Sequence, residues 1–289
     1  MKPASFEYVR PETVADATSH LRDAQGDAKV LAGGQSLIPL LNFRLASPRM
    51  LVDLGSVRDL AYVRASDGIV SVGSMTRMRT LERDARVAES IPALTNAVSW
   101  VGHVQIRNRG TVGGSIAHAD PAAELPALAL LLDGSVTVVG PTGERSMEID
   151  ELLLGFFTTA LEEDELITEA RFAIPDRRAT WGFREFAPRH GDFALAGAAV
   201  LLTPDDRGRT SDARVVVFGG HERALRARES ERALTGSELT VDLADEAAAI
   251  AATETLVDDP RPDAAYRRKL TQAMVARALR DALERRTSP

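Results

Sequence analysis

The chain has 289 residues, 44% hydrophobic and 27% charged, which suits one large or two medium globular domains. Its net charge of −7 and aromatic content of 5% argue against nucleic acid as a partner. It contains no cysteine, which excludes disulfides, thiol nucleophiles and an iron–sulfur cluster held by this chain. No apolar run reaches the roughly 18 residues of a membrane span. We therefore expect no membrane insertion and a cytoplasmic location.

Residues 5–60 alternate between strand and helix patterns. We expect a first strand, then a helix over 13–23, a strand over 29–32, a helix over 36–46 and a strand over 51–54. Such alternation predicts a small α/β unit with right-handed crossovers. In the helix 36–46, Ser36 would be the N-cap and Pro39 would lie in the first turn. Its apolar face would consist of Leu37, Leu40, Leu41 and Leu45.

Further elements follow up to residue 175. The patterns predict a strand over 69–73, a helix capped near Ser74 or Thr76, helices over 91–100 and 123–132, a hairpin of 135–139 with 144–149, and a strand over 166–174. The hairpin prediction rests on the Gly-Pro-Thr-Gly sequence of residues 140–143. Because the polar segment 176–179 follows a proline, we place a domain boundary there. The domains would be 1–176, with subdomains of about 1–57 and 58–176, and 177–289.

The C-terminal part predicts an α+β domain. An antiparallel sheet is expected from 181–187, 193–202 and 213–218, followed by helices over 223–234, 243–257 and 264–285. The last helix would present a broad core face made of Leu270, Met274, Ala278 and Ala282 beside Val275, Leu279 and Leu283.

Two glycine-rich segments are the main functional signal. They are Ala-Gly-Gly-Gln-Ser at 32–36 and Thr-Val-Gly-Gly-Ser at 111–115. The first lies between a predicted strand and a predicted helix, so it would direct free backbone N–H groups at one point, as phosphate sites do. A single Gly-Gly turn is usually only structural. The pair, however, suggests the two sides of one diphosphate clamp.

Candidate side chains near the second segment leave alternatives open. His118 and Asp120 follow it and are candidates either for ligand contact or for helix capping. Arg107 and Arg109 precede it and would either pair with phosphate or hold the turn through carboxylates.

Other catalytic signals are absent. The histidines, at 20, 103, 118, 190 and 221, have no metal-binding spacing, and no nucleophile elbow, dinucleotide fingerprint or Walker motif occurs. The acidic runs 162–165 and 258–259 are interpreted as solvated turns. We predict no catalytic residue and no metal in this chain, and we expect its chemistry to belong to a bound cofactor such as a flavin dinucleotide.

Several motifs, in order, resemble the FAD-binding medium subunit of molybdenum hydroxylases, the carbon monoxide dehydrogenase and xanthine dehydrogenase family. They are 31–37, 105–114, 117–121 and 189–194, and the similarity covers nearly the whole chain. The resemblance implies an FAD-binding domain of the vanillyl-alcohol-oxidase/cresol-methylhydroxylase type in two subdomains, plus a C-terminal α+β domain. It also implies a large subunit with molybdenum-pterin and a small subunit with [2Fe-2S] clusters. This chain would pass electrons through FAD to an external acceptor.

The resemblance also assigns cofactor-binding residues. Those that would cradle the diphosphate and its surroundings are Ala32, Gly33, Gly34, Gln35, Ser36 and Leu37 with Thr111, Gly113, Gly114, Ser115, Ala117 and Asp120. An acidic residue that contacts the sugar-like chain of the flavin maps to Glu124. An apolar residue beside the isoalloxazine maps to Ile167, and an aromatic residue near the ring maps to Phe193.

One departure concerns position 185, where many members place a lysine near the flavin and this chain has Glu185. A carboxylate there would disfavour the anionic reduced flavin if it faces the ring. The stretch 189–194 is closer to members that act on N-heterocycles, which suggests such a substrate for the complex. Two alternatives stay open: a self-contained flavin oxidase of the same fold, and a non-redox nucleotide-binding assembly module.

Overall fold

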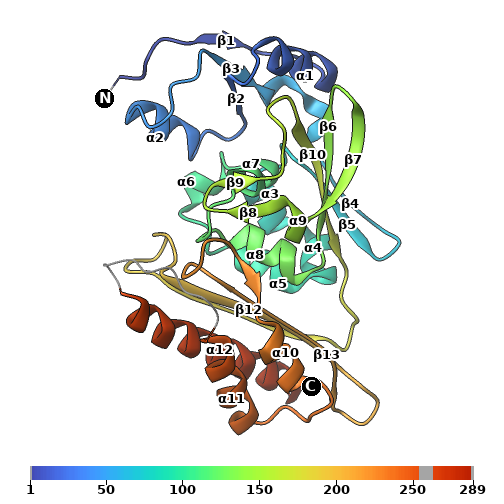
Figure 1. Ribbon diagram of the computed structural model, residues 1–289. Helices are drawn as coiled ribbons and strands as arrows, with labels where there is room; N and C mark the ends of the chain where they lie inside the picture. Colours follow the sequence, from blue (N-terminus) through green and yellow to red (C-terminus); the bar gives the residue numbers. More distant parts are fainter. Residues whose placement is uncertain (1, 254–262, 288–289) are drawn as a thin grey trace.

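A small parallel sheet opens the chain in the computed structural model, which describes residues 2–253 and 263–287 (Figure 1). Its strand order is β1-β3-β2, and both pairs are parallel. The elements of this unit are β1 (Glu7–Val9), α1 (Val14–Asp23), β2 (Ala28–Leu31), α2 (Leu37–Asn42) and β3 (Met50–Asp53). The α/β unit predicted for residues 5–60 is therefore confirmed.

A five-stranded antiparallel sheet forms the centre of the molecule, in the order β4-β5-β10-β6-β7. Its strands are β4 (Val63–Ser66), β5 (Ile69–Gly73), β6 (Ser135–Gly140), β7 (Gly143–Glu148) and β10 (Leu166–Ala173). Two 3-10 turns, η1 (Leu54–Ser56) and η2 (Arg58–Leu60), precede this sheet. The predicted hairpin is confirmed as β6–β7, with Gly140 opposite Gly143.

Short helices and one small hairpin lie between β5 and β10, and none of these helices exceeds eight residues. The helices are α3 (Met78–Arg83), α4 (Ala85–Ser90), α5 (Pro92–Val98), α6 (Val104–Arg107), α7 (Val112–His118), α8 (Glu124–Leu131) and α9 (Ile149–Leu152). The hairpin consists of β8 (Leu153–Gly155) and β9 (Thr158–Thr159).

The C-terminal part is a four-stranded antiparallel sheet with three helices on one face (Figure 1). It contains β11 (Thr180–Phe186), β12 (Ala196–Pro204), β13 (Thr210–Phe218), β14 (Leu225–Arg226), α10 (Arg228–Leu234), α11 (Val241–Ala251) and α12 (Ala264–Thr287). Alternate residues serve two cores: Val200 packs with the three helices, whereas Ala199 and Leu201 pack with the central part of the chain. The sheet is thus a shared wall between the C-terminal helices and α5 and α8.

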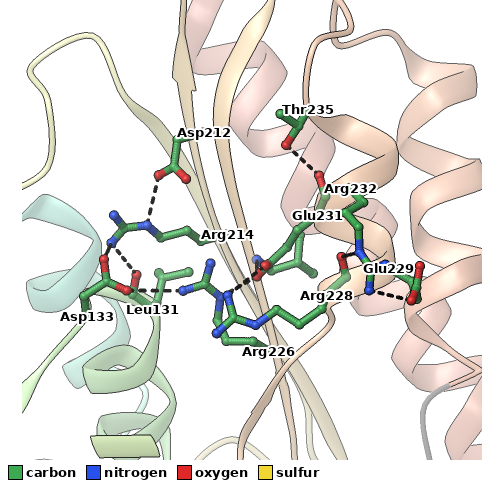
Figure 2. Close-up of polar contacts among 11 residues, drawn as sticks. Leu131, Asp133, Asp212, Arg214, Arg226, Arg228, Glu229, Glu231, Arg232 and Thr235 are labelled. Carbon is green, nitrogen blue, oxygen red and sulfur yellow. Dashed lines mark hydrogen bonds and ion pairs between the residues drawn. The ribbon is translucent and has the colours of Figure 1, made fainter. Parts of the chain in front are cut away.

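An ionic network joins the central part to the C-terminal part (Figure 2). Asp133, just after α8, lies 2.6 Å from Arg214 on β13 and 3.3 Å from Arg226 on β14. Arg226 also pairs with Glu231 on α10, whose side chain accepts a hydrogen bond from the Val215 backbone N–H at 2.9 Å. The network therefore ties α8, β13, β14 and α10 together.

Several predicted boundaries were wrong. The helix predicted over 36–46 ends at Asn42 because Arg44 adopts φ +59°, and Leu45 is 76% exposed instead of packed. Ser36 precedes this helix without a side-chain capping bond. The helix expected near Ser74 or Thr76 begins at Met78, since the Thr76 hydroxyl bonds to the Tyr62 backbone instead.

Three further predicted boundaries differ from the observed ones in the second half of the chain. The strand predicted from 193 begins at Ala196, so Phe193 lies in a loop. The helix predicted over 223–234 begins at Arg228, because residues 225–226 pair with β13. The helix predicted to reach 257 is α11, which ends at Ala251, and residues 254–262 lie outside the described chain.

Candidate functional site

Glycine loop 1, which we define as residues 32–37, joins β2 to α2. Gly34 adopts φ +74°, a left-handed conformation that glycine reaches without strain. Within the described chain, the backbone N–H groups of residues 33–37 donate no hydrogen bond to the protein. Successive N–H groups without a protein partner are the donors that an anion requires. Glycine loop 1 is therefore equipped to bind a phosphate.

Glycine loop 2, which we define as residues 111–115, is the first turn of α7 and its N-cap. Thr111 caps the helix, and its hydroxyl accepts the Gly114 N–H at 3.2 Å. The remaining N–H groups are also used: Val112 donates to the Thr76 carbonyl, Gly113 to the Ser74 carbonyl and Ser115 to the Thr111 carbonyl. Glycine loop 2 therefore differs from glycine loop 1, because α7 itself and the segment after β5 accept the hydrogen bonds of its N–H groups at 112–115.

The two glycine motifs lie close together, because glycine loop 1 contacts the backbone of residues 109–110, which directly precede glycine loop 2. A Cβ atom on Gly33 would overlap the Arg109 carbonyl oxygen and lie 2.8 Å from Gly110 Cα. A Cβ atom on Gly114 would lie 3.3 Å from Ala32 Cβ. Gly33 is thus required for the contact of glycine loop 1 with residues 109–110, whereas a Cβ atom on Gly114 would first meet the Thr111 hydroxyl of its own loop, at 2.7 Å. The sequence predicted that the two glycine motifs act together, but it did not predict that Gly33 is needed for backbone contact with residues 109–110.

The beginning of α7 is buried and its later turn is accessible. Thr111 and Gly113 are buried, whereas Gly114 and Ser115 are partly exposed and Ala117 is exposed. Gly114 and Ala117 lie three residues apart, so they share one helix face. That face, together with glycine loop 1, borders the candidate cofactor site.

His118 and Asp120 follow α7 around a left-handed residue, Ala119, with φ +49°. The His118 ring packs on Phe157 with centroids 5.1 Å apart, and burial lowers the pKa of His118. Asp120 accepts the Ala122 N–H at 2.8 Å, and burial raises the pKa of Asp120. Asp120 therefore closes a tight turn and does not cap α8, whose N-cap is Ala123, and Asp120 remains partly exposed.

Arg107 holds the turn before glycine loop 2. Its buried guanidinium lies 2.8 Å from the Glu82 carboxylate and donates to the Val101 and Gly102 carbonyls at 3.0 and 3.1 Å. Arg109, by contrast, is exposed. Of the two alternatives for Arg107, the structure supports the structural one. The prediction that the acidic run 162–165 is a solvated turn was wrong for Glu165, because it pairs with Arg145 and its side chain is only 7% exposed.

Two carboxyl groups lie where the central part meets the C-terminal sheet. Glu124 is the first residue of α8, and burial raises its pKa to about 7. Glu185 lies on β11, and burial together with the charge of Glu124 raises its pKa to about 8. The Glu185 Oε2 atom is buried and has no hydrogen-bond partner. Sequence reasoning singled out both positions but not their interaction.

Ile167 and Phe193 have opposite environments. Ile167, on β10, is 5% exposed and packs in the central core, next to Thr168, whose carbonyl accepts the Ser74 N–H. Phe193 is 68% exposed on the loop between β11 and β12. This loop packs against the central part of the chain, because the ring centroids of His190 and Trp100 lie 5.7 Å apart.

Neither a membrane-spanning helix nor a metal site is found in the described residues. No helix in the described chain is both long and apolar enough to cross a membrane. Among residues 2–253 and 263–287, no group of three or more histidine or acidic side chains is arranged to hold a metal ion.

Comparisons with known proteins identify the family. Residues 4–176 match the FAD binding domain in molybdopterin dehydrogenase, and residues 181–282 match the C-terminal domain of the CO dehydrogenase flavoprotein. The chain is 44% identical, over 99% of its length and 97% of the relative's, to the 6-hydroxypseudooxynicotine dehydrogenase complex subunit alpha of Paenarthrobacter nicotinovorans.

Two solved structures have the same fold along their whole length. Carbon monoxide dehydrogenase from Hydrogenophaga pseudoflava superposes with a TM-score of 0.95 at 35% identity, covering 99% of each chain. Quinoline 2-oxidoreductase from Pseudomonas putida 86 superposes with a TM-score of 0.94 at 35% identity, covering 100% of each chain. The fold expected from the sequence, an FAD-binding domain followed by an α+β domain, is confirmed. This chain belongs to the FAD-binding medium subunits of molybdenum hydroxylases, the carbon monoxide dehydrogenase and xanthine dehydrogenase family, and is the flavoprotein subunit of an oxidoreductase complex.

Proposed function

We propose that FAD binds between glycine loop 1 and the accessible face of α7. The observation that carries this proposal is the set of N–H groups at 33–37 that the protein leaves without partners. A diphosphate requires several such donors, and the glycines allow the backbone to approach it closely. Glycine loop 2 would act differently from loop 1. Its backbone N–H groups already donate hydrogen bonds within the protein, so glycine loop 2 would instead form one wall of the site and offer the Ser115 hydroxyl.

The remaining site residues are assigned by their positions around these loops. Ala117, Asp120 and Glu124 follow glycine loop 2 along the chain and would line the path of the sugar-like chain. Phe193 would lie on the exposed side of the flavin ring, while buried Ile167 would support the ring from below the surface. Bound FAD supplies the capacity to accept electrons and release them to an acceptor. The protein supplies binding, orientation and the local charge.

We infer that the electrons reach this chain from a [2Fe-2S] subunit and originate at a large subunit that carries molybdenum-pterin. The absence of cysteine supports this division, because iron–sulfur clusters need thiolate ligands that another chain must provide. An external acceptor would then reoxidise the flavin. The cytoplasmic location stays a prediction.

An N-heterocycle is the substrate class we propose for the whole complex. One relative is named for 6-hydroxypseudooxynicotine, and one structural match is named for quinoline. The support is indirect, because the hydroxylation pocket would lie on the large subunit.

The domain boundary is proposed at residues 176–177. Strand β10 of the central sheet ends at Ala173 and strand β11 of the C-terminal sheet begins at Thr180, so the connection belongs to neither sheet. Within the N-terminal domain, the parallel sheet ends at Asp53 and the central sheet begins at Val63, which supports subdomains of about 1–57 and 58–176.

Purification of the tagged chain from its native cells tests the assembly. We expect two companion chains, with iron and molybdenum in the purified material, and hydroxylation of an N-heterocycle only by the complex. A chain that purifies alone with flavin and oxidises a substrate would instead support the self-contained oxidase. A colourless chain that binds free nucleotides would support the assembly module.

A further inference from the structure

Arg77, the residue before α3, lies alongside the segment that leads into glycine loop 2. Its backbone pairs with Thr111, the N-cap of α7, in an isolated antiparallel bridge. The next residue continues this pairing, since the Met78 N–H donates to the Gly110 carbonyl at 3.0 Å. Although Arg77 is distant from both glycine loops in sequence, its backbone is therefore fixed against the start of loop 2.

The side chain of Arg77 reaches the contact between this segment and glycine loop 1. Its Nη1 atom donates a hydrogen bond to the Arg109 carbonyl oxygen, the same atom that a Cβ on Gly33 would overlap. Gly110 also faces loop 1, because a Cβ there would lie 4.0 Å from Gln35 Cγ. The Arg77 guanidinium and glycine loop 1 thus meet at one carbonyl oxygen, where the loop carries its unpaired N–H groups.

Most of the hydrogen-bonding capacity of Arg77 is unused. A guanidinium carries several N–H donors, and within residues 2–253 and 263–287 this one forms a single side-chain hydrogen bond and no ion pair. The Asp53 carboxylate, whose charge acts on Arg77, accepts hydrogen bonds from the Tyr8 hydroxyl and the Gly55 N–H instead. Arg77 is partly exposed and lines a cavity of about 330 Å³, so a ligand can reach its side chain.

A second cation, Arg109, lies next to Arg77. Arg109 is exposed and likewise forms no ion pair within the described part of the chain. Burial and the charge of Arg109 lower the pKa of Arg77. Arg107, by contrast, is buried and paired with Glu82. Two neighbouring guanidinium groups without carboxylate partners repel each other, and a bound anion would offset that repulsion.

We propose that the Arg77 guanidinium binds the diphosphate of FAD together with the N–H groups of glycine loop 1. The proposal rests on the proposed function, because it requires the diphosphate at that loop. Backbone N–H groups offer only dipoles, whereas a diphosphate is ionised at neutral pH. Arginine adds a full positive charge and a planar pair of donors that fits phosphate oxygens. Arg77 thus supplies the countercharge that the loop itself lacks.

The test compares FAD with riboflavin, each titrated by flavin fluorescence against variants of the full chain. Arg77→Met removes the charge and keeps an unbranched side chain, so the Kd for FAD should rise at least about tenfold. The Kd for riboflavin should not change, because riboflavin has no diphosphate. Arg77→Lys retains the charge and should recover much of the lost FAD affinity.

Salt dependence gives a second readout that a purely structural role would not change. The wild-type Kd for FAD should rise with ionic strength, because salt screens the contact between the guanidinium and the diphosphate. Arg77→Met should flatten this rise. Arg83→Met is the matched control, since Arg83 is exposed on α3 and its loss changes the net charge equally. This control should retain the wild-type affinity and salt dependence.

Three results overturn the proposal: an unchanged FAD affinity in Arg77→Met, an equal loss of FAD and riboflavin affinity, or the same salt dependence in Arg77→Met as in the wild-type chain. An equal loss would mean that Arg77 only shapes the backbone around Arg109. A wild-type chain that binds no FAD, alone or in the assembled complex, overturns the proposed function instead, so the two failures are distinguishable.

Discussion

Gly33 illustrates how one missing side chain defines the site. It lies in glycine loop 1 at the point where this loop contacts the backbone of residues 109–110. A side chain there has no flexible neighbour to displace, because the obstructing atoms belong to the main chain. Gly33 therefore allows glycine loop 1 to lie directly against the segment that leads into glycine loop 2.

Gly33→Val should lose bound FAD and destabilise the chain by about 1–3 kcal/mol, as overpacking typically does. Flavin content per chain and the urea midpoint measure the two effects. Gly155→Ala is the control, since no atom lies within 4 Å of its added Cβ. A Gly33→Val chain with full flavin content would show that the close contact of glycine loop 1 with residues 109–110 is irrelevant to binding.

The Glu185 carboxyl group should also affect folding stability. Burial raises its pKa from 4.5 to about 8, so the folded state binds a proton more tightly than the unfolded state. This contribution to stability is fully present below about pH 4.5 and is lost as pH rises through about 8. Glu185→Gln should therefore flatten the decline in the free energy of unfolding between these limits. Parallel slopes in the wild-type and variant chains would contradict the assigned shift.

At the scale of elements, α6 and the turn before α7 depend on one buried ion pair. Arg107→Ala would leave the Val101 and Gly102 carbonyls without their donor and remove a partner of Glu82. We expect a loss of roughly 2–4 kcal/mol in the free energy of unfolding, measured by urea denaturation. Arg86→Ala, which breaks an exposed pair with Asp84, should leave the midpoint unchanged. Equal midpoints for both variants would mean that Arg107 does not hold the turn.

Periodicity predicted the long elements well and the short ones poorly. The continuous apolar run of β12 and the core face of α12 were readable because many residues share the pattern, and Met274, Ala278 and Ala282 are buried as expected. Helices such as α6 and α9, of four residues each, repeat no pattern and depend on tertiary contacts. A Gly-Gly pair usually predicts a turn, whereas Gly113 and Gly114 lie in the first turn of α7. The helical form of glycine loop 2 depends on the carbonyls of residues 74 and 76, which lie far away in the sequence.

The candidate site was predictable in position but not in physical detail. Both glycine motifs could be located from residue type and order alone. Which N–H groups remain free depends on hydrogen bonds to distant segments, such as Gly113 to Ser74. The interaction of Glu124 with Glu185 likewise requires the C-terminal sheet to pack on α8, which no local pattern encodes.

At the scale of the whole molecule, the ionic network of Figure 2 joins the central and C-terminal parts. Glu231 is 7% exposed and contacts Arg226, whose side chain is 9% exposed. Glu231→Ala would leave Arg226 buried with only the 3.3 Å contact to Asp133, and should cost about 3–5 kcal/mol in stability. Glu229→Ala, also on α10, removes an exposed pair with Arg232 and should have little effect. Similar unfolding free energies for the two variants would exclude a role for the network in joining these parts.

The most direct test of diphosphate binding by glycine loop 1 compares FAD with riboflavin as ligands of the full chain, each titrated by flavin fluorescence. Riboflavin has the same ring but lacks the diphosphate that the N–H groups of residues 33–37 would bind. We predict that FAD binds at least about tenfold more tightly than riboflavin, equivalent to about 1.4 kcal/mol, and that ADP competes with FAD. Equal affinities for FAD and riboflavin, or no binding of FAD even in the assembled complex, would contradict this prediction.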